Sequence, residues 1–372
     1  MSYRVLQLIK TYKSNAPLLN SMANLPSEDF TTITCYLTGS DDGKNEMYSN
    51  ASEVIYCQLR KRKVYWSNWQ TVKRLADLID EKQIDLVVCQ FRRTIPIGVV
   101  AALISKRKPK TAGVLHGIVG GRNSLSRQLL NWFAYRKLDA LISISESGRS
   151  AIVKNNIGLR EDAIVAVPNG VDVDRYQARA NQRGDELPTM PQDAVRLLMV
   201  GRLAPVKNHV RVLHAFAEIV KDNSGAQLLI AGKGPLQQQL ERIIEEDGIP
   251  NVHLLGHRSD IPVLLSQVDA FLMPSVREGL PMALMEAMLA GLPVLTSNSA
   301  GMLELVPTEE FGYLVDPNST SSIINGLKEL LSSGVEERKK RALAAQQRVL
   351  ADYTSSVMAQ KYESIFRQML AV

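Results

Sequence analysis

Two glutamates, Glu278 and Glu286, stand eight positions apart in the stretch REGLPMALMEAMLAG. Pro281 suits the opening of a short helix and Gly291 its close, so we expect Glu278 in a loop and Glu286 midway along the helix. The residues around Glu286 are apolar on every side, which predicts a buried carboxylate that needs partners. The vicinal hydroxyls of a ribose would supply two donors, and an internal arginine or a backbone group is the alternative partner.

Glu278 directly precedes the same helix, next to Gly279 and Leu280. Free backbone amides at a helix start favour an anion, so a phosphate group is expected there. We therefore expect Glu278 to contact a sugar beside the phosphates. A solvated loop glutamate is the alternative.

A second turn, GRLAPVKN, places Arg202 and Lys207 around a helix start, for which Asn208 is the expected cap. Two cations beside a helix N-terminus suit a diphosphate. Solvated loop charges are the alternative interpretation of the pair.

Two further turns follow apolar runs. AGKGPLQQQ contains Gly232 and Gly234, which permit close backbone approach, and GHRSDIP offers His257 and Arg258 before the expected helix cap Asp260. The GHRSDIP turn could hold the base of a nucleotide by backbone contacts. A dinucleotide fingerprint would need a third glycine three positions after Gly234, and this chain lacks it, so a dehydrogenase is not favoured.

All these turns follow strand-like runs that alternate with amphipathic helical stretches, which predicts α/β architecture with doubly wound parallel sheets. The runs are 4–9, 33–38, 85–91, 111–116, 140–145 and 164–167 in the first half, and 196–200, 227–231, 252–255, 270–273 and 293–296 in the second. In an open parallel sheet, ligands bind beyond the carboxyl ends of the strands. The four turns therefore predict one composite nucleotide-diphosphate site.

The length of 372 residues favours two hydrophobic cores over one. We expect an N-terminal domain over residues 1–174 and a polar, proline-rich linker over 175–194. A second domain should follow over 195–352, and a final helix within 353–372 should pack back toward the first domain.

Composition and charge limit the partners. Hydrophobic residues make up 45% and charged residues 22%, with a net charge of +6 concentrated in the first half. The basic runs 60–63 and 106–110 contain no interleaved aromatics, so nucleic acid is not an expected partner. A solvated surface, an anionic membrane surface or an anionic lipid-linked acceptor would each suit such runs.

Several absences favour a cytoplasmic chain. The longest apolar stretch, 95–105, is shorter than the roughly 18 residues of a spanning helix, and the N-terminus reads as a first strand rather than a signal peptide. The three cysteines show no metal-binding spacing, which favours buried thiols in a reducing compartment. We expect a cytoplasmic protein, with the inner face of the membrane as its peripheral partner.

The second half, over 196–316, resembles the donor domain of GT-B glycosyltransferases of the GT4 group, whose E-x7-E mark is matched by Glu278 and Glu286. The first half is similar through VLHGI (114–118), SISES (143–147) and VPNGVDVDRY (167–176), so the resemblance covers most of the chain. It implies a GT-B fold, in which two Rossmann-like domains face each other across a cleft.

The resemblance also implies roles. Glu286 would bind the donor ribose, Glu278 the donor hexose, and Arg202 with Lys207 the diphosphate and its departing charge. His116 would contact the donor sugar near the reacting carbon, with strand-end packing as the alternative. One departure is that many relatives carry paired glycines after the first strand, where this chain reads KTYKSNAPLLN.

The implied activity is retaining hexosyl transfer from a nucleotide sugar, with a UDP-sugar favoured, to a lipid-linked or lipopolysaccharide glycan in bacterial surface-polysaccharide biosynthesis. No cofactor and no metal are expected, because the acidic pair Asp172 and Asp174 opens the linker rather than a metal site. Three alternatives stay open: a glycoside hydrolase using two carboxylates, a sugar-nucleotide epimerase of similar two-domain fold, and a catalytically silent nucleotide-sugar-binding subunit.

Overall fold

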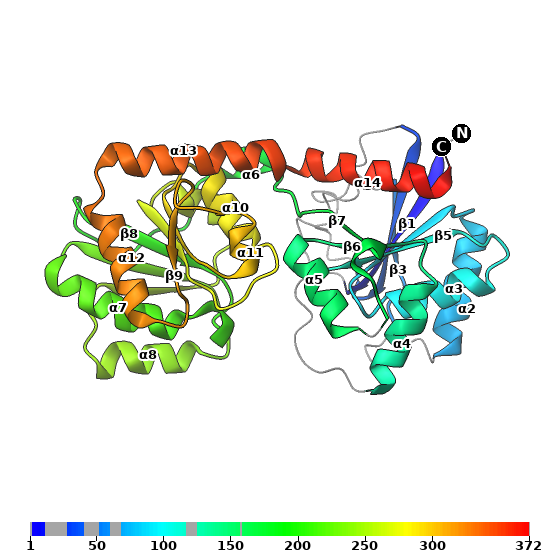
Figure 1. Ribbon diagram of the computed structural model, residues 1–372, viewed down its shortest axis with the longest axis horizontal. Coiled ribbons are helices and arrows are strands. Elements are labelled where there is room, and N and C mark those ends of the chain that lie inside the picture. Colours follow the sequence, from blue (N-terminus) through cyan, green and yellow to red (C-terminus); the bar gives the residue numbers. More distant parts are fainter. Residues whose placement is uncertain are drawn as a thin grey trace. The chain divides into compact units, whose positions relative to one another are not determined.

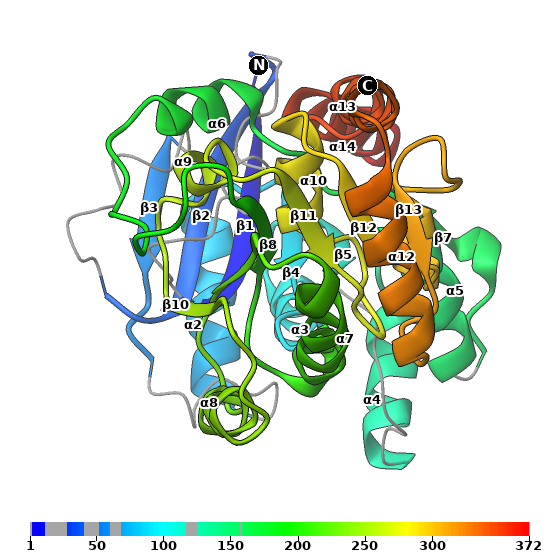
Figure 2. The ribbon, with the colours of Figure 1, turned by 90° about the vertical axis from the view of Figure 1, so that its left-hand side faces the viewer.

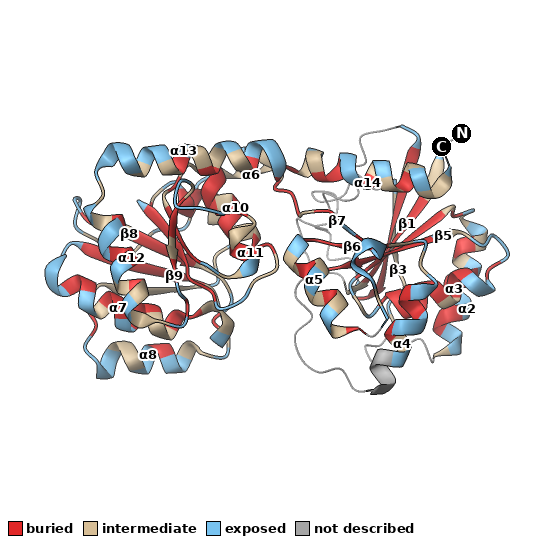
Figure 3. Cartoon of the chain, viewed as in Figure 1, coloured by how far each residue is buried: buried red, intermediate tan, exposed pale blue. Residues whose placement is uncertain are grey.

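The computed structural model describes residues 2–11, 28–40, 52–59, 68–116, 125–156 and 158–371, with side chains from residue 129 onward in the helix that begins at 125. The chain forms two compact units. Unit 1 comprises residues 1–170 and 355–372, and unit 2 comprises Val171–Thr354. In each unit, helices cover both faces of a sheet whose strands are largely buried (Figures 1 and 3).

The described part of unit 1 contains a seven-stranded sheet in which every strand pair is parallel. The strands are β1 (Tyr3–Thr11), β2 (Phe30–Thr38), β3 (Glu53–Tyr56), β4 (Leu86–Gln90), β5 (Lys110–Leu115), β6 (Ala140–Ser143) and β7 (Ile164–Ala166). They lie in the order β3-β2-β1-β4-β5-β6-β7. The central strands are continuous apolar runs because both faces of a covered parallel sheet are buried.

Helices cover this sheet on both faces. They are α2 (Trp69–Glu81), α3 (Ile95–Ile104), α4 (Leu125–Arg136), α5 (Glu146–Asn155), a 3₁₀ turn η3 (Glu161–Ala163), and the last helix of the chain, α14 (Ser355–Leu370). The Asn68 side chain caps α2 by accepting a hydrogen bond from the Thr71 amide. Helix α14 packs on the sheet through Met358, Tyr362 and Phe366, so the end of the chain belongs to unit 1.

Unit 2 repeats this plan with a six-stranded, all-parallel sheet. Its strands are β8 (Val195–Val200), β9 (Ala226–Ala231), β10 (Val252–Gly256), β11 (Ala270–Met273), β12 (Val294–Ser297) and β13 (Tyr313–Val315). They lie in the order β10-β9-β8-β11-β12-β13. The carboxyl ends of these strands share one edge, where the turns with the candidate residues lie.

Two apolar layers enclose this second sheet. Its helical elements are α6 (Val173–Ala180), η4 (Pro205–Lys207), α7 (His209–Asp222), α8 (Gln237–Glu246), α9 (Ile261–Leu265), α10 (Met282–Leu289), α11 (Ala300–Leu303), α12 (Thr320–Ser332) and α13 (Val335–Asp352). Figure 2 shows α10 and α13 toward one face and α7 with α12 toward the other. Each layer is a separate hydrophobic cluster.

The segment interpreted as a linker, 175–194, differs from its expected role. It lies inside unit 2, and its first part forms helix α6. Tyr176, Leu187 and Met190 pack against the core of unit 2, so this polar-looking segment contributes apolar contacts that its composition hides. The units divide after residue 170 rather than after 174.

Among the helices that the structure describes, none has the combination of length and apolar composition needed to cross a bilayer.

Candidate functional site

The turns after β8, β9 and β10 interlock through their backbones. The Gly201 amide donates to the Ala231 carbonyl at 2.9 Å, and the Gly232 amide donates to the Gly256 carbonyl at 2.6 Å. A Cβ on Gly232 would lie 1.8 Å from the Gly201 carbonyl oxygen, so no side chain fits there. The close approach expected at this glycine is therefore to the chain's own backbone.

Gly234 is constrained in the same way by the turn after β8. A Cβ there would lie 2.3 Å from the Leu203 carbonyl oxygen. The Leu203 amide donates to the Lys233 carbonyl at 3.2 Å, which fixes the two turns against each other. Both glycines of the AGKGP turn thus let it pack closely against the turn after β8.

A pocket of about 300 Å³ lies between these turns. It is lined by Val200, Gly201, Arg202, Ala231, Gly232, Lys233, His257, Arg258 and Ile261. Arg202 and Lys233 are exposed, and neither side chain makes a hydrogen bond or ion pair within the described parts of the chain. Two uncommitted cations at the mouth of a small pocket suit an anionic ligand.

Arg258 lines the pocket but is already engaged. Its guanidinium donates two hydrogen bonds, 2.7 and 2.6 Å long, to the Asp260 carboxylate, and a third of 2.9 Å to the Asp185 carbonyl. The ion pair holds the Asp260 pKa below its ordinary value. Asp260 occupies the position before α9 but does not cap it, because its carboxylate serves Arg258 and the Asp185 amide instead. Arg258 therefore forms part of the pocket wall, and its charge is already paired with Asp260.

Lys207 closes the turn after β8, where its Nζ lies 2.7 Å from Glu278 Oε1. Both side chains are mostly buried, at 19% and 16% exposure, and the approach is an ion pair rather than an aligned hydrogen bond. Gly201 leaves room for the lysine, since a Cβ there would lie 3.2 Å from its Cε. The structure thus brings two predicted residues from different turns into contact.

Asn208 holds that turn in place, but not as the helix cap we expected. It adopts a left-handed conformation with φ 65°, and its side chain makes no capping bond to α7. Its amide instead donates to the Pro274 carbonyl at 3.0 Å and the Pro317 carbonyl at 2.7 Å. Buried Asn208 therefore ties together the turns after β8, β11 and β13.

The loop that carries Glu278 is held from two sides. The Val276 amide donates to the Val206 carbonyl at 2.8 Å, and a Cβ on Gly301 would lie 2.2 Å from the Glu278 carbonyl oxygen. Within the described residues, the Gly279 and Leu280 amides find no backbone acceptor. They precede α10 and can donate to an anion, as the sequence predicts.

Glu286 lies midway along α10 and is partly exposed rather than fully buried. No hydrogen bond or ion pair reaches its carboxylate from any residue the structure describes, so the internal partner that we considered is not found. The surrounding protein raises its pKa to about 7, against a smaller lowering by Arg179 and Arg175 of α6. The carboxyl group is thus enclosed, reachable and uncommitted.

His116 belongs to unit 1, at the end of β5. Its Nε2 lies 2.7 Å from Gln90 Oε1, and its ring packs against Phe91 with a 4.3 Å centroid distance. Burial lowers the pKa of His116 to about 4, so the ring is neutral near pH 7. Its Nδ1 has no partner in the described part of the chain and can accept a hydrogen bond. The other candidates all lie in unit 2.

A metal site is not formed by the acidic pair in the DVD motif. The Asp172 side chain caps α6 by accepting from the Arg175 amide at 3.1 Å, and Asp174 lies in the first turn of that helix. Across the described ranges, no cluster of three or more histidine, cysteine, aspartate or glutamate side chains could hold a metal ion.

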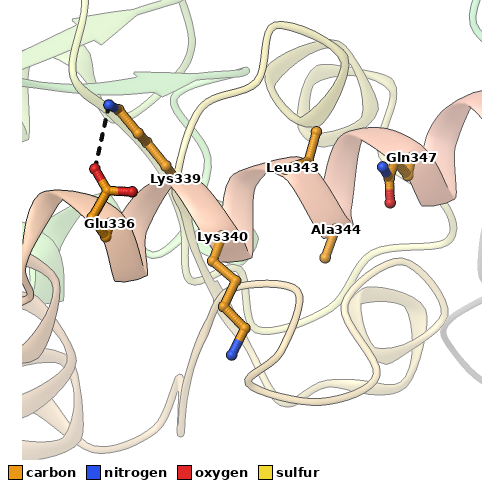
Figure 4. A pocket seen from close by; sticks show the side chains of 6 residues that line it. All are labelled: Glu336, Lys339, Lys340, Leu343, Ala344 and Gln347. Atoms are coloured by element: carbon orange, nitrogen blue, oxygen red, sulfur yellow. Dashed lines mark ion pairs between the residues drawn. The ribbon is translucent and has the colours of Figure 1, made fainter.

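A second hollow of about 390 Å³ lies along α13 and differs from the first pocket in its lining. Its lining residues are Glu336, Lys339, Lys340, Leu343, Ala344 and Gln347, all from one helix (Figure 4). Lys339 pairs with Glu336 at 3.6 Å, and no other element supplies a wall. This hollow is helix surface, so the turns at the sheet edge remain the candidate site.

Comparison with known proteins finds family matches over both halves of the chain. The model of the family "Glycosyl transferases group 1" matches residues 187–348, and that of "Glycosyltransferase Family 4" matches residues 25–175. A galactosyltransferase of Escherichia coli, named as acting on α-D-GlcNAc-diphosphoundecaprenol with UDP-Gal, is 29% identical over 68% of each chain. The Staphylococcus aureus capsular polysaccharide glycosyltransferase CapM is 23% identical over 89% of each chain.

Solved structures show the same fold. A glycosyltransferase from Rickettsia africae superposes with a TM-score of 0.82 at 18% identity, covering 99% of both chains. The Anabaena protein HepE, solved with UDP and glucose, gives 0.78 at 19% identity, covering 97% of this chain and 98% of its own. The chain therefore has the two-domain, Rossmann-like GT-B fold. The family models and the sequence relatives identify it as a glycosyltransferase. These matches agree with the sequence resemblance to GT4-like hexosyltransferases.

The sequence interpretation missed two contributors. Lys233 lines the pocket, and its signal was available in its position between the two glycines of AGKGP. Helix α6 brings Arg175 and Arg179 near Glu286, but a polar segment interpreted as a linker gave no sign of this contact.

Proposed function

We propose that the chain is a retaining glycosyltransferase that moves a hexose from a UDP-sugar to a lipid-linked or lipopolysaccharide glycan in bacterial surface-polysaccharide biosynthesis. The observation that carries the donor assignment is the enclosed but uncommitted carboxylate of Glu286 in the unit that also contains the cationic pocket. The two vicinal hydroxyls of a ribose would supply the hydrogen-bond donors that this carboxylate lacks. The relatives named for colanic acid and capsule biosynthesis support the biological setting.

In this proposal the diphosphate is held at the edge of the second sheet. Arg202, Lys207 and Lys233 supply positive charge, and the free amides of Gly279 and Leu280 supply donors. As the bond between the sugar and the diphosphate breaks, negative charge grows on the leaving oxygen, where these groups stabilise it. They would do so without a metal ion.

Glu278 would contact the hexose next to the diphosphate, in a position fixed by its ion pair with Lys207. His116, neutral and with an unused Nδ1, would accept a hydrogen bond from a sugar hydroxyl. The acceptor hydroxyl would attack on the face from which the diphosphate leaves. Its proton would pass to the leaving diphosphate. Because the new bond would form on the face from which the diphosphate leaves, the anomeric configuration would be retained.

UDP as the donor nucleotide is supported by HepE, solved with UDP and with UDP-glucose, and by the Escherichia coli relative named for UDP-Gal. That relative's diphosphoundecaprenol acceptor supports a lipid-linked glycan as the acceptor class. A lipid-linked acceptor would place the enzyme at the inner face of the cytoplasmic membrane.

The test is transfer itself. The purified chain is incubated in EDTA with UDP-galactose or UDP-glucose and a short-chain prenyl-diphosphate GlcNAc, and the product's anomeric configuration is read by NMR. An α-linked disaccharide from an α-linked donor supports the proposal, and a β-linked product contradicts retention. Interconversion of the two UDP-sugars without acceptor would show an epimerase, whereas donor binding with no product from any acceptor would indicate a silent subunit.

A further inference from the structure

Helix α4 of unit 1 exposes a run of large apolar side chains. Leu129, Trp132 and Phe133 are 65%, 44% and 41% exposed, while Ala134 and Tyr135 of the same helix are buried in unit 1. Figure 3 shows the mixture of buried and exposed residues along this helix. Water-exposed Leu, Trp and Phe side by side on one helix are unusual in a soluble surface and mark an interaction site.

The apolar residues share their helix face with cations. Positions 129, 132, 133 and 136 follow helical spacing, so Arg136 continues the face that Leu129, Trp132 and Phe133 form, here called the α4 face. The Arg136 guanidinium lies 4.9 Å from the Trp132 ring centroid, and Lys137 is also exposed. The sequence over 117–138 contains four Arg or Lys residues and no Asp or Glu.

We propose that the α4 face docks on the surface of a bilayer that contains anionic phospholipid. Trp and Phe suit the boundary between headgroups and acyl chains, and adjacent Arg and Lys attract the negative surface. An acidic protein partner would match the cations but would not need three large apolar groups next to them. The proposal rests on the proposed function, because a lipid-linked acceptor is presented at such a surface.

The basic run 106–110 does not offer an equivalent surface, although its composition alone suggested one. Arg107 forms an ion pair with Asp85, and Lys110 pairs with Asp139 at 3.0 Å. The Asp80 carboxylate accepts from the backbone amides of residues 106 and 107. These contacts offset much of the positive charge within unit 1 itself, whereas the α4 face combines charge with apolar area.

The first test is vesicle binding. The full chain is sedimented with vesicles of 30% phosphatidylglycerol and 70% phosphatidylcholine, and with phosphatidylcholine alone, for the wild type and for Trp132→Ser combined with Phe133→Ser. Both side chains are exposed, so the variant should fold. We expect binding to the anionic vesicles to fall roughly tenfold or more in the variant. Leu343→Ser, an equally exposed apolar loss on α13, should bind as the wild type does.

The second test measures depth. The chain has three tryptophans, Trp66, Trp69 and Trp132, so Trp66→Phe with Trp69→Phe leaves Trp132 as the sole reporter. Its fluorescence should shift to the blue on anionic vesicles and be quenched by lipids brominated near the headgroup end of the acyl chain. An emission wavelength of Trp132 that is unchanged by the vesicles, together with no quenching by brominated lipid, would overturn the proposal.

Two other outcomes would also overturn it. Vesicle binding unchanged by the double substitution would place the membrane contact elsewhere. A wild-type dimer in sedimentation equilibrium that the same substitution converts to monomer, with no vesicle binding, would show that a second copy covers the α4 face. UDP-sugar calorimetry on the same variants separates the two ideas, since vesicle binding without donor binding would contradict only the proposed function.

Discussion

Replacing Glu286 with glutamine should stabilise unit 2 while removing donor binding. Burial raises the pKa of this carboxyl group from 4.5 to about 7, although Arg179 and Arg175 lower it in part. Because the folded-state pKa lies above the unfolded value, the wild type has its full stability below about pH 4.5 and loses part of it as the pH rises to about 7. Glutamine keeps the shape but never ionises.

The size of the effect follows from the pKa displacement. Moving the pKa from 4.5 to about 7 corresponds to roughly 3 kcal/mol of folding free energy once the group is fully ionised. This is an upper limit, because the side chain is partly exposed and water screens its charge. We therefore expect the Glu286→Gln protein to gain about 1 to 3 kcal/mol over wild type at pH 8, relative to the difference at pH 5.

Scanning calorimetry is the suitable assay, since all three tryptophans lie outside unit 2 and their fluorescence does not report on it. For a unit of this size, each kcal/mol raises Tm by about 2–4 °C. Glu337→Gln is the matched control: Arg341 lowers the pKa of this exposed carboxylate, so it is ionised at both pH 5 and pH 8, and its replacement should change Tm nearly equally at the two pH values. Equal Tm differences between the Glu286→Gln protein and wild type at pH 5 and pH 8 would refute the reasoning.

Three further predictions concern other residues. Lys207→Met should lower kcat for transfer by roughly 10²–10³-fold with a smaller change in KM, because its charge acts on the leaving diphosphate; steady-state kinetics with unchanged kcat would contradict this. Gly232→Ala should destabilise unit 2 by about 1–3 kcal/mol, since its Cβ would overlap a carbonyl oxygen, whereas Gly225→Ala, with open space around it, should be nearly neutral in the same denaturation assay. Iodoacetamide at pH 7.5 should modify Cys57 first, because a neighbouring thiol 3.5 Å away lowers its pKa to about 7. Burial raises the pKa of Cys89 to about 12, so faster labelling of Cys89 by mass spectrometry would contradict that assignment.

The alternation of apolar runs and amphipathic stretches predicted most of the fold. It placed the strand over 270–273 at the bounds of β11, and the run 227–231 within one residue of β9. The strands that it missed, β3 and β13, are four and three residues long. Helix α6 was missed for another reason: its few apolar residues pack individually into a core that other segments supply.

The candidate site was predictable as a set of turns but not as a set of contacts. Strand ends on one sheet edge identified Lys207 and Glu278, and the structure adds their ion pair. The contacts of Arg258 and Asn208 did not follow from the sequence, because polar residues at turns serve ligands and neighbouring backbone equally well. Their contacts in the structure distinguish Arg258 from Arg202: Arg258 is hydrogen-bonded to Asp260, whereas Arg202 makes no such contact within the described residues.

In the proposed function, unit 2 binds a nucleotide sugar through Glu286 without a metal ion. The most direct test is calorimetric titration of the purified chain in EDTA with UDP-, GDP- and ADP-sugars, repeated on Glu286→Ala for any donor that binds. We predict micromolar binding of a UDP-sugar that weakens at least tenfold in the variant. Binding to none of the donors, or equal affinity in the variant, would contradict the account.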